Sequence, residues 1–433
     1  MSHLLYEKIA TRSLHVAVIG LGYVGLPLAT TFAQAGFQVT GIDIDQQKID
    51  KANRGESYIP DISSSTLQAL IEAKRLRFTS DYAALAEVDA INICVPTPLR
   101  KTRDPDISFI IAATQQVRVH LRPGQLVVLE STTYPGTTDE VVRPELEATG
   151  LKVGSDFFLA FSPERIDPGN TNFDTRTTPK IVGGITKTCT ELAQAFYAAA
   201  IEKVVPVSSA RVAEMAKLLE NTFRAVNIGL VNEIAIICEK LGINVWEVID
   251  AAATKPFGFM PFLPGPGLGG HCIPVDPHYL SWKLKTLDYT ARFIELAAQI
   301  NSSMPHYVVD KISEALNEQR RSFNGATVLV LGIAYKANVG DVRESPALDI
   351  MQELMARKSV VLYNDEYIPS LTLCNRTLYS QPLSSGLLAA ADCVVIVTDH
   401  SYYDIPWIID EARCIVDTRN MTRGYDHAKI YRL

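Results

Sequence analysis

A cysteine in a short glycine-rich segment has the clearest chemical potential in this sequence. The run Gly269-Gly270-His271-Cys272-Ile-Pro-Val-Asp276 places two glycines just before Cys272 and an acid four residues after it. Most free cysteines are small hydrophobic core residues, and that role fits Cys238, Cys393 and Cys414 among their apolar neighbours. It fits Cys272 poorly. We interpret Cys272 as a candidate nucleophile, with an inert thiol as the alternative.

A lysine and an amide fall on one side of a predicted helix. Lys217 and Asn221 are four residues apart, so a helix brings them to the same face. An ammonium and an amide can stabilise a developing alkoxide or take part in proton transfer. A solvent-facing pair is the alternative interpretation.

Two further polar residues follow predicted strands. Glu164, in Ser162-Pro-Glu-Arg165, comes after a strand and can activate water, although an acid at the start of a helix is the alternative. Thr132 follows the strand 125–129. Its place is the carboxyl edge of the sheet, where α/β sheets bind their ligands.

The first strand leads into a dinucleotide-binding fingerprint. Gly20-Leu-Gly22-Tyr23-Val24-Gly25 follows strand 15–19 and opens a helix, and Asp43 ends the next strand 18 residues after the last glycine. The glycines allow a tight turn and close approach of a pyrophosphate. The acid binds ribose hydroxyls and repels a 2′-phosphate, which favours NAD over NADP. An ordinary glycine-rich turn is the alternative. Lys48 is either an adenosine contact or a surface lysine.

A thiol beside NAD extends what oxidation can achieve. An aldehyde from a first hydride transfer can be captured as a thiohemiacetal, oxidised again to a thioester, and released by water as a carboxylate. Such a site needs a base, a cation for the oxyanion, a thiol and a water activator. The sequence offers residues of these types in Asp276, Lys217, Cys272 and Glu164.

The elements that must position these residues follow an α/β pattern. Strand-like runs alternate with helical stretches through the first half, which predicts a parallel sheet and a Rossmann-like domain. These runs lie at 15–19, 38–43, 90–95, 125–129, 157–160, 180–182 and 203–207.

A long helix is predicted from residue 208 to about 240, because apolar residues recur there at helical spacing. They are Val212, Met215, Leu219, Phe223, Val226 and Leu230. This face could form a dimer core or be buried within one chain. A second helical region covers about 291–318, and the segment 256–270 between them is too rich in Pro and Gly for regular structure.

Strand–helix alternation returns after Asn324-Gly325, with strands at 327–331, 360–363, 393–397 and 414–416. The expected fold is therefore α/β, with two Rossmann-like parallel-sheet domains joined by a long central helix. We expect domains at 1–207, 208–320 and 321–433. The last domain has only Gly332 after its first strand, so it lacks the glycines for a second dinucleotide, but Lys336 and Arg343 can supply charge to another phosphate ligand.

Composition excludes several classes of protein. The 433 residues are 47% hydrophobic and 21% charged, and 41 Lys plus Arg against 48 Asp plus Glu give a net charge of −7. Such a chain is not drawn to nucleic acid, and no apolar run reaches the roughly 18 residues of a membrane span. The seven cysteines form no Cys-x-x-Cys pair, and His271 and His278 suggest no metal site. An acid near the N-terminus argues against a signal peptide. We expect a cytoplasmic protein.

Several motifs in order resemble the UDP-glucose/GDP-mannose dehydrogenase family over nearly the whole chain. They are Gly-Leu-Gly-Tyr-Val-Gly-Leu-Pro (20–27), Val-Pro-Thr-Pro (95–98), Ser-Pro-Glu (162–164), Lys217 with Asn221, Gly-Gly-His-Cys (269–272) and Gly-Ile-Ala-Tyr-Lys (332–336). The resemblance implies oxidation of a nucleotide sugar's C6 alcohol to an acid with two NAD+, a homodimer or higher homo-oligomer through the central helices, and a UDP-binding C-terminal domain.

The resemblance also assigns roles. It implies that Cys272 is the nucleophile, that Lys217 and Asp276 are its acid/base and oxyanion partners, and that Asn221 is an orienting group. Water would be handled by Glu164 and Thr132. The NAD contacts are expected at Gly20, Gly22, Tyr23, Val24, Gly25, Asp43, Lys48, Thr97, Thr132 and Arg343, and the sugar-nucleotide contacts at Glu164, Arg165, Lys217, Asn221, Lys255, Gly269 and Lys336.

Segments 162–169 and 255–272 look like the branch of this family that acts on UDP-N-acetylhexosamines in O-antigen and lipopolysaccharide synthesis. UDP-N-acetylglucosamine is the expected substrate, and UDP-N-acetylgalactosamine and UDP-glucose are alternatives. Pro168 and Pro256 stand where UDP-glucose enzymes carry an acid and an arginine, which Arg165 and Lys255 would replace. A two-electron hydroxyacid-type dehydrogenase and a catalytically silent NAD-binding protein are the competing hypotheses.

Overall fold

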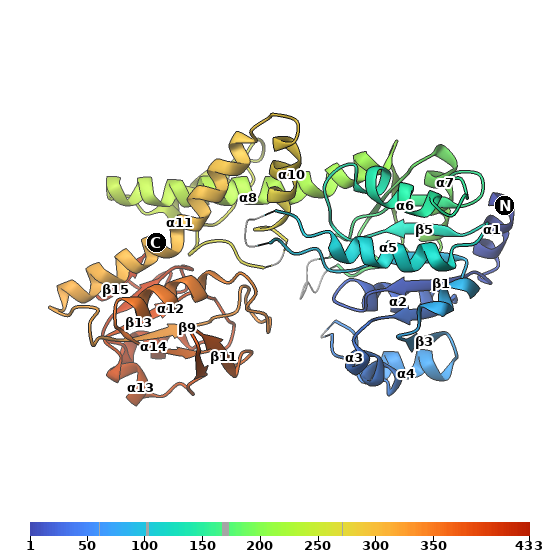
Figure 1. Ribbon diagram of the computed structural model, residues 1–433. Coiled ribbons are helices and arrows are strands. Elements are labelled where there is room, and N and C mark those ends of the chain that lie inside the picture. Colours follow the sequence, from blue (N-terminus) through green and yellow to red (C-terminus); the bar gives the residue numbers. More distant parts are fainter. Residues whose placement is uncertain (60, 101–103, 167–172, 271) are drawn as a thin grey trace. The chain divides into compact units, whose positions relative to one another are not determined.

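The chain divides into two compact units. The structure, a computed structural model, describes residues 1–59, 61–100, 104–166, 173–270 and 272–433. The first unit comprises residues 1–220 and 278–289, and the second comprises 221–277 and 290–433. Figure 1 follows the chain through both units. The three-domain division with boundaries after residues 207 and 320 stays a prediction.

An eight-stranded sheet is the centre of the first unit. Across it lie β3 (Leu76–Thr79), β2 (Gln38–Ile42), β1 (His15–Ile19), β4 (Ala90–Ile93), β5 (Leu126–Leu129), β6 (Phe158–Phe161), β7 (Lys180–Gly184) and β8 (Val204–Pro206), in that order. All neighbours are parallel except β6 and β7. A parallel pair needs a crossover, usually a helix, and the described residues between β6 and β7 contain none.

Helices cover both faces of this sheet. One face carries α1 (Ser2–Ala10), α2 (Gly25–Gln34), α3 (Gln46–Asn53), α4 (Ser64–Glu72) and α7 (Lys187–Ala198). The other carries η1 (Tyr82–Glu87), α5 (Ser108–His120) and α6 (Arg143–Glu147), which η2 (Thr138–Val142) precedes. Alternate residues of β1 serve the two cores, because successive strand side chains point to opposite faces.

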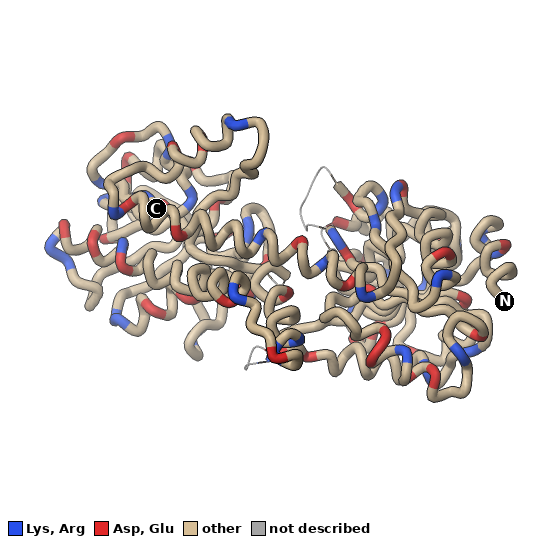
Figure 2. The backbone as a smooth tube through the Cα atoms, turned by 90° about the horizontal axis from the view of Figure 1, so that it is seen from above, with Lys and Arg blue, Asp and Glu red and all other residues tan. Residues whose placement is uncertain are grey.

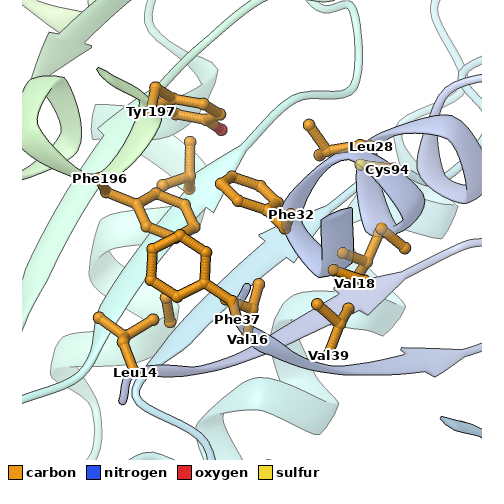
Figure 3. Close-up of a cluster of buried hydrophobic side chains, with 14 of the residues drawn as sticks. Leu14, Val16, Val18, Leu28, Phe32, Phe37, Val39, Cys94, Phe196 and Tyr197 are labelled. Carbon is orange, nitrogen blue, oxygen red and sulfur yellow. The ribbon is translucent and has the colours of Figure 1, made fainter. Parts of the chain in front are cut away.

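An aromatic cluster fills the first of these cores. Phe32 of α2 stacks on Phe196 of α7 with ring centroids 4.4 Å apart, and Tyr197 lies beside them (Figure 3). Val16 and Val18 of β1 face this cluster. The packing fixes the strand that leads into the glycine fingerprint against the helix that follows it.

A five-stranded parallel sheet forms the core of the second unit. Its order is β10 (Val360–Asn364), β9 (Thr327–Leu331), β13 (Cys393–Ile396), β14 (Ile415–Asp417) and β15 (Ile430–Arg432). On one face lie α11 (Arg292–Glu318) and α12 (Pro346–Ala356), and on the other α13 (Ser385–Ala390) and α14 (Ile405–Glu411). A short hairpin pairs β11 (Ser370–Leu373) with β12 (Arg376–Tyr379).

The long helix α8 (Ala210–Leu241) confirms the prediction from helical spacing and runs on from one unit into the other. It is followed by α9 (Val245–Ala253), the irregular segment 256–270 and α10 (Asp276–Lys285). The predicted fold class, two Rossmann-like sheets with a long helix between them in the chain, is confirmed.

The apolar stripe of α8 is not buried within the chain. Five of its six predicted residues are exposed, with Leu219 at 58%, and Val226 is half-buried; the exposed ones are Val212, Met215, Leu219, Phe223 and Leu230. Of the two alternatives for this face, the structure therefore removes burial inside the monomer.

Charged residues of both signs are interspersed along each unit (Figure 2). No helix in the described part of the chain is long and apolar enough to cross a membrane.

Candidate active site

The glycine fingerprint forms the turn between β1 and α2. Gly20 has φ +88°, and a Cβ there would lie 2.4 Å from the carbonyl oxygen of Cys94. A Cβ at Gly25 would lie 1.7 Å from the carbonyl oxygen of Gly20. In contrast, a Cβ at Gly22 would meet nothing within 4 Å. The turn itself therefore requires glycine at positions 20 and 25, whereas Gly22 borders open space.

The residues around this turn fit a dinucleotide. Tyr23 and Val24 are half-buried, and Val24 is the N-cap residue of α2 with no side-chain cap, so the N-terminus of the helix, which favours phosphate, lies at this turn. Asp43 is buried at the end of β2, where its Oδ2 accepts from Leu21 N at 2.8 Å. Lys48 Nζ lies 3.7 Å from the same oxygen. The Asp43 carboxylate is therefore fixed beside the turn, and Lys48 is partly engaged by it.

Thr97 and Thr132 follow β4 and β5, at the carboxyl edge of the sheet. The Thr97 carbonyl oxygen accepts a hydrogen bond from the hydroxyl of Tyr279 on α10 at 2.8 Å. Thr132 is half-buried at the start of the loop 131–138. Sequence reasoning did not single out Tyr279, because a tyrosine in a helical pattern gives no sign of a partner 182 residues away.

Glu164 belongs to a buried network of three charged side chains. Lys180 Nζ donates to Glu130 Oε2 at 2.5 Å and to Glu164 Oε2 at 3.0 Å. Glu130 also accepts from the Tyr197 hydroxyl at 2.5 Å and from Asn92 Nδ2 at 2.7 Å. The sequence analysis gave no role to Lys180, whose ammonium is a counter-charge shared by the two acids.

The network sets the charge state of Glu164. Burial acts to raise the pKa of Glu164, but Lys180 and the backbone N–H groups of Arg165 and Ile166 outweigh it, so the pKa is lowered. Burial raises the pKa of Glu130 despite the same lysine. Glu164 is thus held as a carboxylate. No helix begins in the described residues just after Glu164, so the alternative of a helix-start acid is wrong.

The thiol segment packs on loops of the C-terminal sheet in the second unit. Gly270 N donates to Arg343 O at 3.0 Å. A Cβ at Gly270 would lie 2.9 Å from the ring of Tyr335, and a Cβ at Gly269 would lie 2.7 Å from Tyr335 Cβ. The two glycines therefore allow this segment to approach the loop that contains Gly-Ile-Ala-Tyr-Lys336.

Cys272 stands one turn before α10. Its carbonyl oxygen accepts from the backbone N–H groups of Val275 at 3.1 Å and Asp276 at 2.8 Å. The cysteine is partly accessible. Asp276 is buried at the first position of α10, and the side-chain amide of Asn221 on α8 donates to its carboxylate. Asn221 is thus linked to Asp276 by a side-chain hydrogen bond, and Asp276 is linked to Cys272 through the backbone.

Lys217 lies one helical turn before Asn221 on α8. It is only 8% exposed, and no described residue forms an ion pair with it. Because so little of its side chain is exposed, the alternative of a solvent-facing lysine is wrong. Lysines are rarely buried without a partner. A buried ammonium of this kind is suited to an anionic ligand or a developing oxyanion.

Two of the remaining predicted contacts, Arg165 and Arg343, form ion pairs with acidic side chains. Arg165 pairs with Glu220 of α8 at 2.6 Å, and Arg343 pairs with Asp341 at 2.6 Å. Lys255 is exposed, with its Nζ 5.0 Å from the ring centroid of Phe257. Lys336 is half-buried after Gly332. Pro168 and His271 lie outside the described residues.

Arg419 is a candidate that sequence reasoning missed. Its Nε donates to Val397 O at 2.9 Å, and a Cβ at Gly265 would lie 2.8 Å from its Nη1. Burial lowers the pKa of the guanidinium, although Asp399 and Asp417 act to raise it. This cation follows β14, at the carboxyl edge of the second sheet, where α/β sheets bind ligands.

Three family models match successive parts of the chain. The NAD-binding domain of the UDP-glucose/GDP-mannose dehydrogenase family matches residues 14–201, its central domain 211–303, and its UDP-binding domain 329–424.

Individual relatives match over most of their length. An NDP-N-acetyl-D-galactosaminuronic acid dehydrogenase from Ralstonia nicotianae is 36% identical over 94% of this chain and 96% of its own. A UDP-N-acetyl-D-glucosamine 6-dehydrogenase from Pseudomonas aeruginosa is 36% identical over 90% of this chain and 92% of its own. The solved structure of a UDP-D-ManNAc dehydrogenase from Pyrococcus horikoshii has 34% identity and a TM-score of 0.88, covering 97% of this chain and 99% of that one.

Proposed function

Because the chain belongs to the UDP-glucose/GDP-mannose dehydrogenase family, we propose that it oxidises the C6 hydroxyl of a UDP-N-acetylhexosamine to the carboxylate with two NAD+. As a member of that family it is an NAD-dependent nucleotide-sugar dehydrogenase with an NAD-binding and a UDP-binding domain. Our proposal adds three points to this family membership. They are the oxidation by four electrons, the acetylated sugar as substrate, and the roles of individual residues.

One observation carries the proposal. The thiol segment packs directly on the loop after β9 in the UDP-binding domain, through Gly269 and Gly270 against Tyr335. A nucleotide bound at the carboxyl edge of that sheet would therefore have a thiol segment beside it. Lys336 and Arg419 are the cations we assign to the diphosphate.

The first oxidation converts the C6 alcohol to an aldehyde. The hydroxyl proton leaves to a base, for which we propose Asp276, oriented by Asn221. NAD+, when bound, would supply the hydride acceptor for each of the two oxidations. The residues proposed to hold it are those of the Gly20–Gly25 turn together with Asp43.

The thiol makes the second oxidation possible. The Cys272 sulfur adds to the aldehyde carbon to form a thiohemiacetal, and Lys217 stabilises the oxygen that becomes negative. Loss of the second hydride and of the hydroxyl proton leaves a thioester. Water then attacks the carbonyl, the C–S bond breaks, and carboxylate and thiol are released. We assign the orientation of this water to Glu164 and Thr132.

The acetylated sugar is supported by relatives of comparable identity. The relatives described above are named for galacto, gluco and manno N-acetylhexosamine derivatives. We propose UDP-N-acetylglucosamine, from the likeness of segments 162–169 and 255–272 to enzymes of that branch. Since one hydroxyl's configuration separates these sugars, the choice is decided by a few contacts.

A panel of sugars tests the proposed substrate. Initial rates of NADH formation are measured with UDP-N-acetylglucosamine, UDP-N-acetylgalactosamine, UDP-N-acetylmannosamine, UDP-glucose and GDP-mannose at equal concentration. An acetylated UDP-sugar should exceed UDP-glucose by at least about 10-fold. Turnover of UDP-glucose alone would overturn the assignment to acetylated sugars.

We also propose that the exposed apolar face of α8 forms a homodimer. This face lies opposite to Lys217 and Asn221, since α-helical residues advance by about 100° each. A row of exposed apolar side chains along one helix face is typical of a protein interface.

Leu219→Glu should dissociate the dimer, because it places a charge in the middle of the apolar face. Sedimentation velocity at micromolar concentration is the measurement. Leu4→Glu on α1 is the matched control, because Leu4 is 56% exposed and Leu219 58%. A monomeric wild-type protein, or dissociation by both variants alike, contradicts the assignment.

A further inference from the structure

Glu214 is a buried carboxylate to which the proposed reaction gives no role. It lies in the first turns of α8 and is 0% exposed. A carboxylate is seldom buried completely unless it is tied to several donors. Its donors therefore indicate what it holds.

Within the described part of the chain, the hydrogen-bond donors to Glu214 are Gly136 and Thr138, which lie close together after β5. Glu214 Oε2 accepts from Gly136 N at 2.6 Å, and its Oε1 accepts from Thr138 N at 2.9 Å and from Thr138 Oγ1 at 2.7 Å. These donors end the segment 131–138, which follows β5, begins with Ser131 and Thr132, and runs into η2 at Thr138. The side chain thus closes the far end of the loop onto α8.

The loop has little freedom to move independently of this contact. Gly136 has φ +106°, a conformation that other residues rarely adopt. The hydroxyls of Thr133 and Thr137 are 2.7 Å apart. On the other side, the ring of Tyr134 lies 5.1 Å from that of Trp282 of α10. Displacing Gly136 and Thr138 would therefore shift the loop as a body, including Thr132.

Glu214 shares a helix face with the proposed site residues. Glu214, Lys217 and Asn221 stand at positions i, i+3 and i+7 of α8, which lie along one face of an α-helix. The helix that carries the proposed oxyanion cation therefore also holds the loop that carries the proposed water-orienting hydroxyl.

We propose that Glu214 is a positioning residue that fixes Thr132 relative to Lys217, and so sets the rate of thioester hydrolysis. This inference rests on the proposed function, because hydrolysis on Cys272 is the step in which Thr132 takes part. Glu214 itself touches neither substrate nor cofactor in this account.

Charged groups nearby pair mainly with one another. Arg211 of α8 bonds Asp139 at 2.9 Å and lies 3.2 Å from Glu140, and Lys283 of α10 bonds Glu140 at 2.7 Å. Tyr134 is a further titratable neighbour of Glu214. Burial raises the pKa of Glu214 to about 6, although the loop donors oppose it. Protonation below that pH removes acceptor capacity, so the loop should loosen as the pH falls.

Glu214→Gln is the direct test. The amide has the same shape, but its NH2 group is a donor and cannot accept from both ends of the loop. We expect thioester hydrolysis to slow by about 10- to 100-fold. The variant should show a rapid burst of two NADH per active site followed by slow turnover, with an unchanged dissociation constant for NAD. Its hydrolysis rate should also lack the decline near pH 6 expected of the wild type.

Two further variants keep the test decisive. Thr138→Val removes one of the donors to Glu214 and should slow thioester hydrolysis by a smaller factor than Glu214→Gln does. This variant still tests the contact if Glu214→Gln folds poorly. Glu72→Gln changes an exposed acid of α4 and should match the wild type. Equal hydrolysis rates in Glu214→Gln, Thr138→Val and wild type overturn the positioning role. Failure of the wild type to form a carboxylate would instead overturn the proposed function.

Discussion

Replacing Cys272 by serine is expected to lower the rate of carboxylate formation by about 10³-fold or more. A thiolate is a far stronger nucleophile near neutral pH than a serine hydroxyl, so the aldehyde is not captured. Any NADH that is still formed should stop at one per sugar. NAD and UDP-sugar binding should be retained. The measurement is the initial rate of acid formation together with the yield of NADH.

Cys374→Ser is the matched control for this prediction. Cys374 is an exposed free cysteine in the turn between β11 and β12, so the same atom is changed outside the proposed site. Its activity should equal that of the wild type. Undiminished acid formation by Cys272→Ser would remove the thiol from the mechanism and leave a two-electron dehydrogenase as the better account.

Lys180→Met is expected to lower the free energy of unfolding by about 3–5 kcal/mol. The substitution leaves Glu130 and Glu164 buried without their shared cation. Without the lysine, burial should raise the pKa of both carboxyl groups in the folded variant above their values in the unfolded chain. The folded variant is then most stable at low pH, where both groups are protonated, and loses stability as the pH rises and they ionise. The deficit should therefore be larger at pH 8 than at pH 5. Urea unfolding followed by circular dichroism measures it.

Two variants accompany Lys180→Met. Lys187→Met removes an exposed lysine of α7 whose Nζ lies 3.7 Å from Glu191, and it should change stability by no more than about 0.5 kcal/mol. The double variant Lys180→Met/Glu130→Gln removes one of the two unpaired buried carboxylates. It should recover part of the lost free energy of unfolding. If Lys180→Met and Lys187→Met lowered the free energy of unfolding by the same amount, the buried network would contribute little to stability.

Most of the framework could be predicted because its signals are local. Alternating β-branched runs located β1, β2, β4 and β5, and helical spacing over 208–240 gave α8 to within a residue or two. The glycine fingerprint was readable because turn, helix and acid stand at short, fixed separations. The weak strand β3 and the terminal strand β15 were missed, since short strands with few apolar residues carry little periodic signal.

The supporting charges could not be predicted because their partners are distant in sequence. Lys180 is 50 residues from Glu130, and Glu214 is 78 residues from Gly136. Each is an ordinary polar residue within its own segment. The antiparallel pairing of β6 with β7 was missed for a similar reason, since strand direction is set by the connection between them.

The yield of NADH per molecule of sugar tests the central claim most directly. With NAD+ in excess, UDP-N-acetylglucosamine or its epimers are consumed to completion by the wild-type protein, and NADH and product acid are quantified together. The account predicts two NADH and one carboxylate for each sugar. A yield of one NADH with accumulation of the aldehyde would contradict it, because the second oxidation is what Cys272 is proposed to provide.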